Sequence, residues 1–195
     1  MTRAFVALLL DEAMRASVAA EIERLRPLSR AVAWVPAVNL HLTLRFLGDL
    51  SDVQIGEVEA VLAEVAAVTA PFALNLHGLG AFPGLERPRI LWVGIADGAL
   101  PCREVQARVE IALQRHGIPP ERQAWHPHLT IGRVFDERAW RREAGLALRQ
   151  ALAAAARRTF GTLAVSRIAL MRSDLSPQGA RYRELASAEL TLGLP

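Results

Sequence analysis

Apolar side chains recur along the chain with two periods, and each period predicts one kind of element. A recurrence every three or four residues is typical of one face of an α-helix, whereas alternation or a short apolar run is typical of a strand. The helical period indicates four helices, at residues 11–25, 51–70, 101–116 and 137–156. Strands are predicted at residues 3–10, 31–35, 40–47, 72–79, 90–95, 162–172 and 182–190, and around His128.

Signals at the helix ends support this assignment. Asp11 is a typical N-cap residue, and Ser51 with Gln54 three positions later forms a capping box. Pro101 suits the first turn of a helix, and Gly117 suits the position after the last turn. The last helix is predicted to place one set of residues on its apolar side: Trp140, Ala144, Ala147, Ala151 and Ala155.

The order of the predicted elements indicates a duplicated arrangement. Strand, helix, strands, helix and strands follow one another, and a similar series then returns. This order predicts the α+β class, with two lobes of common ancestry in a single domain over residues 1–195. Each lobe contains one His-Leu-Thr tripeptide.

Composition limits the chemistry that the chain can perform. With 52% hydrophobic and 22% charged residues, it is typical of a folded globular protein. All 23 basic side chains are Arg, which reflects either compositional drift or the use of guanidinium forks for phosphate binding. The lack of Lys excludes a covalent lysyl-nucleotide intermediate, a Schiff base and a Walker-type phosphate lysine.

Features that would indicate a membrane or an oxidising compartment are absent from the sequence. The apolar start from Ala4 to Leu10 is too short to span a bilayer and is followed at once by Asp11 and Glu12. Cys102 is the only cysteine, which excludes an internal disulfide and a zinc site built from several cysteines. We therefore expect a cytoplasmic monomer with no membrane association and no protein partner.

One tripeptide, His-Leu-Thr, occurs twice. It begins at His41 in the run NLHLTLRFLG and at His128 in the run HPHLTIGRVF. Because side chains along a strand alternate between its faces, each His shares a face with the Thr two residues later, Thr43 or Thr130. If the two lobes pack about a pseudo-twofold axis, both pairs line one cleft.

Two imidazoles and two hydroxyls suit the attack of water on a phosphodiester. A neutral His takes a proton from water while a protonated His donates one to the leaving oxygen. The Thr hydroxyls can hydrogen-bond the non-bridging oxygens. This chemistry needs no metal ion and no other cofactor, and the residues alone leave open which His is the acid.

Five blocks together resemble a known family: RAFVALLL, NLHLTLRFLGDL, GLGAFPGLERPRILWVGI, HPHLTIGRV and LMRSDLSPQGARYREL. In order and character they are similar to the 2H phosphoesterases, a superfamily named for two H-x-T motifs. More closely they resemble the bacterial and archaeal RNA 2',3'-cyclic phosphodiesterases, also called 2'-5' RNA ligases. The resemblance covers nearly the whole chain.

The resemblance implies a bilobal duplicated fold in which two antiparallel sheets face a central cleft, with helices on the outer faces. It also implies hydrolysis of RNA 2',3'-cyclic phosphate ends, or of nucleoside 2',3'-cyclic phosphates, to 2'-phosphates, with reversible 2'-5' ligation as a side activity. His41 would then donate a proton to the 3' oxygen, and His128 would activate water.

Two arginines match basic positions of the family's motifs. Arg133 follows the second motif and is predicted to contact phosphate, the alternative being a salt bridge at the end of a strand. Arg45 follows the first motif, and strand alternation places it on the side of His41 as a second phosphate contact. The alternative for Arg45 is a solvated charge at the rim.

Three other functions remain open at this stage. A metal hydrolase would use His126 and His128 but lacks an evident third ligand. A non-catalytic RNA-binding module would stack bases on Phe82, Trp92 or Trp125. RNA ligation would have to proceed by reversal of a transesterification, because the chain has no Lys for a covalent nucleotide intermediate.

Overall fold

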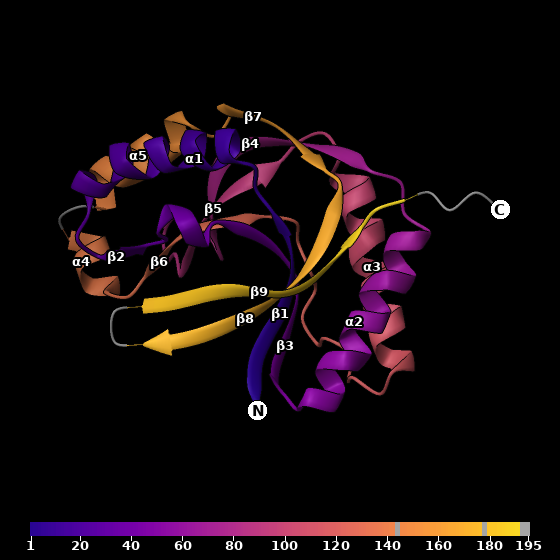
Figure 1. The fold of residues 1–195 in the computed structure, drawn as a ribbon. Helices are drawn as coiled ribbons and strands as arrows, with labels where there is room; N and C mark the ends of the chain where they lie inside the picture. Colours follow the sequence, from indigo (N-terminus) through magenta and orange to yellow (C-terminus); the bar gives the residue numbers. More distant parts are fainter. Residues whose placement is uncertain (143–144, 177–178, 192–195) are drawn as a thin grey trace.

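Two antiparallel sheets form the framework of the protein (Figure 1). The computed structural model describes residues 1–142, 145–176 and 179–191. Sheet A has the strand order β3 (His41–Leu50), β1 (Thr2–Leu9), β8 (Arg167–Ser176), β9 (Gly179–Glu189). Sheet B has the order β2 (Val32–Trp34), β6 (Leu129–Val134), β5 (Ile90–Ile95), β4 (Phe72–Phe82), β7 (Thr159–Val165).

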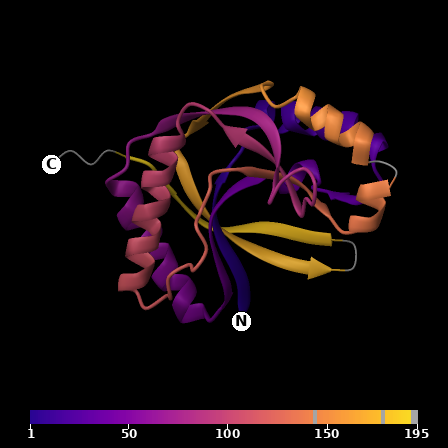
Figure 2. The ribbon, with the colours of Figure 1, turned by 180° about the vertical axis from the view of Figure 1, so that it is seen from behind.

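Helices cover the two sheets from different sides, as the view from behind also shows (Figure 2). Helix α2 (Asp52–Ala67) contacts β3, β8 and β9, and α3 (Ala99–Arg115) contacts α2 and β3. On sheet B, α1 (Glu12–Leu25) contacts β7, and α5 (Gly145–Ala154) contacts β4 and the short helix α4 (Glu137–Arg142). The short 3-10 helices η1 (Arg26–Leu28) and η2 (Ala37–Asn39) flank β2. The predicted α+β class with two antiparallel sheets is confirmed.

The predicted helix at 137–156 differs most from the structure. It is two helices, α4 and α5, and Ala144 lies outside the described residues. Trp140 is fully buried as predicted, but Ala147 is exposed, and Leu148 and Leu152 form the buried side of α5. Ala151 packs against the core and Ala155 is buried, so these positions agree with the prediction. Only Ala147 is wrong among the described members of the stripe, because the larger Leu148 beside it gains more from burial.

Each sheet takes strands from distant parts of the chain. Sheet A joins β1 and β3 to the C-terminal hairpin of β8 and β9, and sheet B joins β2 to the later strands β4–β7. The predicted terminal strand pair is present as the hairpin of β8 and β9. The predicted strand 162–172 is divided, however, because β7 ends at Val165 and lies in the other sheet. A cut at the middle of the chain would not separate the sheets, and the common ancestry of the two lobes stays a prediction.

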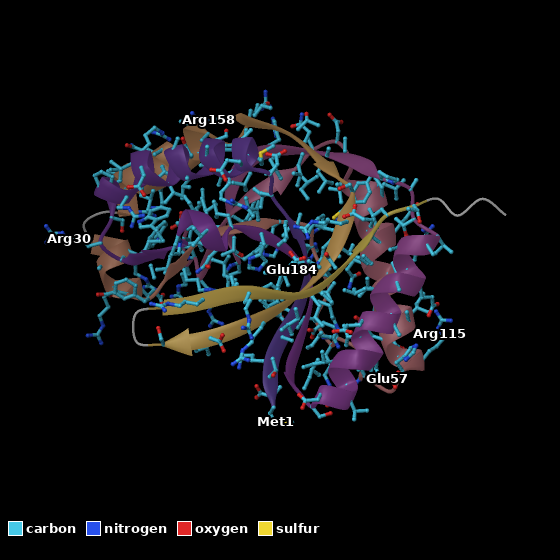
Figure 3. All side chains as sticks on the ribbon, viewed as in Figure 1. Met1, Arg30, Glu57, Arg115, Arg158 and Glu184 are labelled. Carbon is cyan, nitrogen blue, oxygen red and sulfur yellow. The ribbon has the colours of Figure 1, made fainter. Side chains whose placement is uncertain are left out.

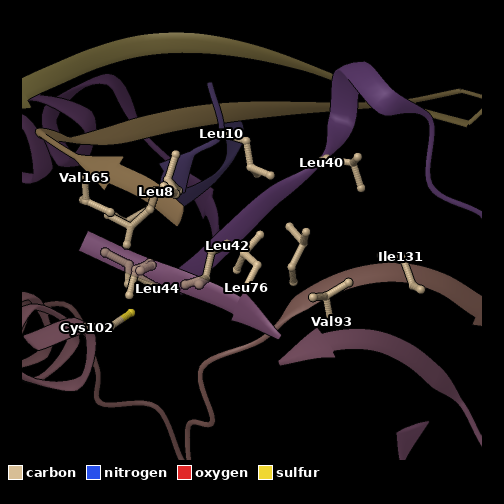
Figure 4. Packing of buried hydrophobic residues seen from close by; sticks show 14 of the residues in the cluster. Leu8, Leu10, Leu40, Leu42, Leu44, Leu76, Val93, Cys102, Ile131 and Val165 are labelled. Atoms are coloured by element: carbon tan, nitrogen blue, oxygen red, sulfur yellow. The ribbon is translucent and has the colours of Figure 1, made fainter. Parts of the chain in front are cut away.

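A shared apolar core fixes the strand of the first motif relative to sheet B. Leu42 and Leu44 of β3 belong to the same buried cluster as Leu76 and Val93 of sheet B (Figure 4). Full burial of one such side chain contributes about 1.5–3 kcal/mol, so β3 is held firmly against the other sheet. Cys102 lies in this cluster, and its burial raises the pKa of the thiol to about 12, which leaves it unreactive.

No helix in the described part of the chain has both the length and the apolar character needed to cross a membrane.

Candidate active site

A β-bulge in β3 decides which side chains share a face with His41. Thr43 pairs with Ala7 of β1, but Arg45 pairs with Val6, so that Leu44 is the extra residue of the bulge. Alternation is shifted by one position beyond a bulge. Odd-numbered side chains up to residue 43 therefore share the face of His41, whereas beyond residue 44 the next even-numbered one does.

The bulge turns Arg45 to the face opposite His41, and the prediction that the two share a side is wrong. Arg45 is only 8% exposed and forms ion pairs with Glu110 and Glu121. Its charge is already compensated by two carboxylates, so Arg45 is not retained as a phosphate contact. Phe46 occupies the His41 face instead.

Phe46 is a candidate functional residue that sequence reasoning missed. It pairs with Phe5, whose ring stacks on His41, and the Phe5 and Phe46 ring centroids are 6.2 Å apart. With 57% of its surface exposed, Phe46 presents an apolar ring to solvent beside the first motif. In the sequence Phe46 stands between Arg45 and Leu47 and is typical of any apolar strand residue; only the bulge places it on the face of His41.

A second bulge, at Ile131 in β6, has the opposite effect on Arg133. Thr130 pairs with Trp92, whereas Arg133 pairs with Ile90, which lies on the same face of β5 as Trp92. Simple alternation would place Arg133 on the other side of the strand from His128, but the extra residue returns it to the His128 face. Among the described residues, no hydrogen bond or ion pair engages its guanidinium.

The ring of His41 is held in one orientation. Its Nδ1 donates to the backbone oxygen of Asn39 over 2.8 Å, and its Nε2 lies 3.0 Å from the hydroxyl of Thr43. Phe5 stacks on the ring with centroids 4.6 Å apart, and Tyr182 contacts it edge-on at 5.1 Å. Because a carbonyl oxygen only accepts, Nδ1 carries a proton and Nε2 is the nitrogen that can gain or lose a further proton.

His128 is held in the same manner. Its Nδ1 donates to the backbone oxygen of His126 over 2.7 Å, and Phe82 contacts the ring edge-on at 5.1 Å. The acceptor is again the carbonyl two residues earlier, so Nε2 is again the nitrogen that can gain or lose a further proton. Each motif thus presents an imidazole with the same tautomer and an aromatic neighbour.

Burial is the largest influence on the acidity of both rings. It lowers the pKa of His41, the hydrogen bond to Asn39 raises it, and the charge of Arg133 lowers it. It also lowers the pKa of His128, the His126 carbonyl raises it, and charges on the His126 ring and Arg133 lower it. One guanidinium therefore lies within electrostatic reach of both imidazoles.

Direct contacts join the two motifs although they belong to different sheets. Strands β3 and β6 contact each other. The indole nitrogen of Trp125 donates to the backbone oxygen of Thr43 over 3.0 Å. The segment that leads into the second motif is therefore fixed to the strand of the first.

The aromatic residues considered as base-stacking surfaces have other contacts. Trp92 packs against Phe82, with ring centroids 5.2 Å apart, and lies directly over Gly80. The indole nitrogen of Trp125 donates to the backbone oxygen of Thr43. In the described part of the chain, no group of three or more His, Cys, Asp and Glu side chains could hold a metal ion, so the alternative based on His126 and His128 lacks a third ligand.

Comparison with known sequences gives consistent matches. A family model described as the 2'-5' RNA ligase superfamily matches residues 14–177. An RNA 2',3'-cyclic phosphodiesterase of Aeropyrum pernix is 37% identical over 147 residues, which cover 75% of this chain and 80% of that protein. One of Aquifex aeolicus is 33% identical over 185 residues, 93% of this chain and 94% of that protein.

Solved structures match over nearly the full length. TT0787 of Thermus thermophilus superposes with a TM-score of 0.78 at 28% identity, covering 96% of this chain and 97% of that one. Escherichia coli LigT in complex with 3'-AMP gives a TM-score of 0.77 at 23% identity, with 97% and 98% covered. At this identity the LigT match concerns the fold alone.

Proposed function

The chain belongs to the 2'-5' RNA ligase superfamily, and on that premise we propose that it hydrolyses RNA 2',3'-cyclic phosphate ends to 2'-phosphates. The curated relatives named RNA 2',3'-cyclic phosphodiesterase support this reaction. The observation that carries the proposal is the pair of tautomer-locked imidazoles, His41 and His128, within reach of the single cation of Arg133. We expect RNA ends and nucleoside 2',3'-cyclic phosphates as substrates of a monomeric cytoplasmic enzyme.

The reaction follows from the protonation states of the two rings. Neutral His128 accepts a proton from water at Nε2, and the water oxygen attacks phosphorus. The bond from phosphorus to the 3' oxygen breaks, and charged His41 gives its Nε2 proton to that oxygen. The products are a 2'-phosphate and a 3'-hydroxyl, with His128 charged and His41 neutral until both exchange protons with solvent.

The side chains around the two histidines support this assignment of acid and base. The leaving 3' oxygen belongs to the ribose, so the acid must stand on the nucleoside side. Phe46 and Tyr182 offer ring surface on the His41 side, with the buried ring of Phe5 in contact with both and with His41. Arg133 shares its face with His128 and suits the charged phosphate. The nucleoside then lies toward Phe46 and the attacking water toward His128.

The threonines and Arg133 would bind the phosphate oxygens. Thr43 already contacts His41 Nε2, and a hydroxyl at this place can bond a non-bridging oxygen once substrate binds. Thr130 lies on the His128 face and is assigned the same role. Arg133 neutralises charge on the phosphate as the fifth oxygen joins phosphorus.

Ligation would use the same groups. If the 5'-hydroxyl of a second RNA replaces water, its oxygen attacks phosphorus, His128 takes its proton, and the 3' oxygen leaves with the proton of His41. A 2'-5' phosphodiester forms with no net change in the number of phosphodiester bonds, so the reaction is reversible. Because water is present at about 55 M, hydrolysis prevails over ligation with time.

The decisive experiment uses a short RNA with a 2',3'-cyclic phosphate end, incubated with the protein in excess chelator. We expect conversion to a 2'-phosphate, identified by resistance to a phosphatase specific for 3'-phosphates and by ³¹P NMR. Formation of a 3'-phosphate would contradict the assignment of His41 as donor to the 3' oxygen. Loss of turnover in chelator would contradict a metal-independent reaction.

A further inference from the structure

Arg45 forms the centre of a polar cluster between β3 and the segment that follows α3. Its Nε lies 2.8 Å from Glu110 Oε2, and its Nη1 lies 3.0 Å from Glu121 Oε2. The Nε–H does not point at the Glu110 oxygen, so this contact is an ion pair rather than a hydrogen bond. The same guanidinium donates to the backbone oxygens of Phe46 and Pro119.

The two carboxylates also bind the backbone of the segment that follows α3. Glu110 accepts from the backbone nitrogen of Glu121 over 2.8 Å. Glu121 accepts from the backbone nitrogens of Arg122 and Gln123 over 2.9 and 3.3 Å. Residues 119–123 contain no helix or strand, so these side-chain contacts supply the order that secondary structure would otherwise give.

The anchored segment leads directly into the second motif. Two residues beyond Gln123, Trp125 donates to the Thr43 carbonyl. One residue later, the His126 carbonyl accepts from Nδ1 of His128. A continuous set of contacts thus connects Arg45, which lies two residues after Thr43, to the ring of the second histidine.

Arg45 is also the only cation that these contacts bring to Glu110 and Glu121 within the described residues. Glu110 is 17% exposed, so its charge is poorly screened by water. Without the guanidinium, two carboxylates would face each other, and their repulsion would push the segment away from β3. Removal of one partner of a buried ion pair leaves an uncompensated charge.

We propose that Arg45 is a positioning residue, which holds the segment 119–127 against β3 and thereby sets His128 opposite His41. This role rests on the proposed two-histidine reaction. It replaces direct phosphate binding as the function of the cation after the first motif. The bulge at Leu44 is what makes it available, because it turns the guanidinium away from substrate and toward α3.

The test compares Arg45→Met with a matched control, Arg158→Met. Arg158 pairs with Glu21, which is 1% exposed, on the side of α1 and β7 (Figure 3). It lines a surface hollow of about 420 Å³ that contains neither histidine. Both substitutions leave a carboxylate with less compensation of its charge, but only Arg45 contacts the segment before His128.

Turnover of a 2',3'-cyclic RNA end and the NMR signal of the Trp125 indole N–H are measured on each variant, the signal being assigned from Trp125→Phe. For Arg45→Met we expect kcat to fall about 10- to 100-fold with KM changed less than about threefold, since small misplacement of a catalytic group has effects of this size. The Trp125 signal should move. Arg45→Lys should restore part of both, and Arg158→Met should change neither.

Glu121→Gln provides a second route if Arg45→Met does not fold, because Glu121 is 36% exposed and its replacement is nearly isosteric. It should lower kcat and move the Trp125 signal in the same direction. The inference would be overturned if a folded Arg45→Met variant kept the wild-type kcat and an unmoved Trp125 signal. If Arg45→Met is unfolded, the same result in Glu121→Gln would overturn it. An inactive wild type would instead contradict the proposed function, while the indole signal would still decide the role of Arg45.

Discussion

The indole nitrogen of Trp125 lies 3.0 Å from the backbone oxygen of Thr43 and joins the approaches to the two histidine motifs. Thr43 follows His41 by two residues, and Trp125 precedes His128 by three. Each partner of this hydrogen bond lies within three residues of a candidate catalytic histidine. We therefore expect loss of the bond to displace one imidazole relative to the other. In the proposed reaction the two motifs act as one site, and we expect this contact to keep them together.

Trp125→Phe keeps an aromatic ring but removes the donor to Thr43. We expect a loss of about 0.5–1.5 kcal/mol in the free energy of unfolding, typical of one hydrogen bond, together with a clear fall in kcat. Trp140→Phe is the control, because Trp140 donates in the same way to the backbone oxygen of Leu85, which belongs to neither motif. Denaturant unfolding and turnover of a cyclic-phosphate RNA check the pair; equal kcat in both variants would argue against the role given to Trp125.

His41→Ala and His128→Ala should each lower kcat by about 10²- to 10⁴-fold, the range for one general acid or base. Their losses should not add in the double variant, because both groups serve one transition state. Binding of the product nucleotide, measured by calorimetry, should stay within a few-fold of the wild type. Activity that survives in either single variant at near wild-type level would exclude the two-histidine reaction.

The pH dependence follows from the lowered pKa of both rings. The base must be neutral, so kcat/KM rises with pH through the pKa of His128, and the acid must be charged, so it falls through the pKa of His41. Burial and Arg133 lower both pKa values, which places both limbs of the bell on the acid side of 6.5, the usual imidazole value. A profile that stays flat from pH 5 to 8 (roughly the range over which imidazoles titrate) would contradict the assignment.

Arg133→Gln separates the electrostatic role of this residue from phosphate binding. Loss of the positive charge should raise the pKa of both imidazoles, so both limbs of the kcat/KM profile should move to higher pH. Loss of the phosphate contact should also raise KM, with little change in stability because Arg133 is exposed and has no ion pair among the described residues. If KM rises and the limbs stay in place, Arg133 acts on substrate alone.

Phe46→Ala tests the nucleoside side of the site. Base stacking on an aromatic ring is worth about 1–3 kcal/mol, so kcat/KM should fall about 5- to 150-fold while stability changes little. Phe46 is 57% exposed, and Ile111 on the outer helix α3 is 59% exposed, so Ile111→Ala is a control of equal exposure. Similar kcat/KM values for the two variants would count against a stacking role for Phe46.

The sequence predicts the strands that carry the motifs and the pairing of each His with its Thr, because both lie on the near side of a bulge. Beyond Leu44 and Ile131 the period of two no longer holds, and nothing in the letters marks the extra residue. This is why Arg45 was assigned to the wrong face and why Phe46 was missed. The contact of Trp125 with Thr43 joins residues 82 positions apart, a distance at which local patterns carry no information.

Gly80→Ala should disturb the second motif through two aromatic rings. A methyl group at Gly80 would lie 2.3 Å from the ring of Trp92, which contacts Phe82, and Phe82 in turn contacts His128. Because an indole cannot bend away, we expect a loss of about 1–3 kcal/mol in stability and a lower kcat. Gly56→Ala, in helix α2, has no atom within 4 Å of the new methyl group and should instead stabilise by about 0.5–1 kcal/mol with unchanged kcat. A lower melting temperature for Gly80→Ala and a higher one for Gly56→Ala would support this packing argument. A Gly80→Ala variant as stable and active as the wild type would refute it.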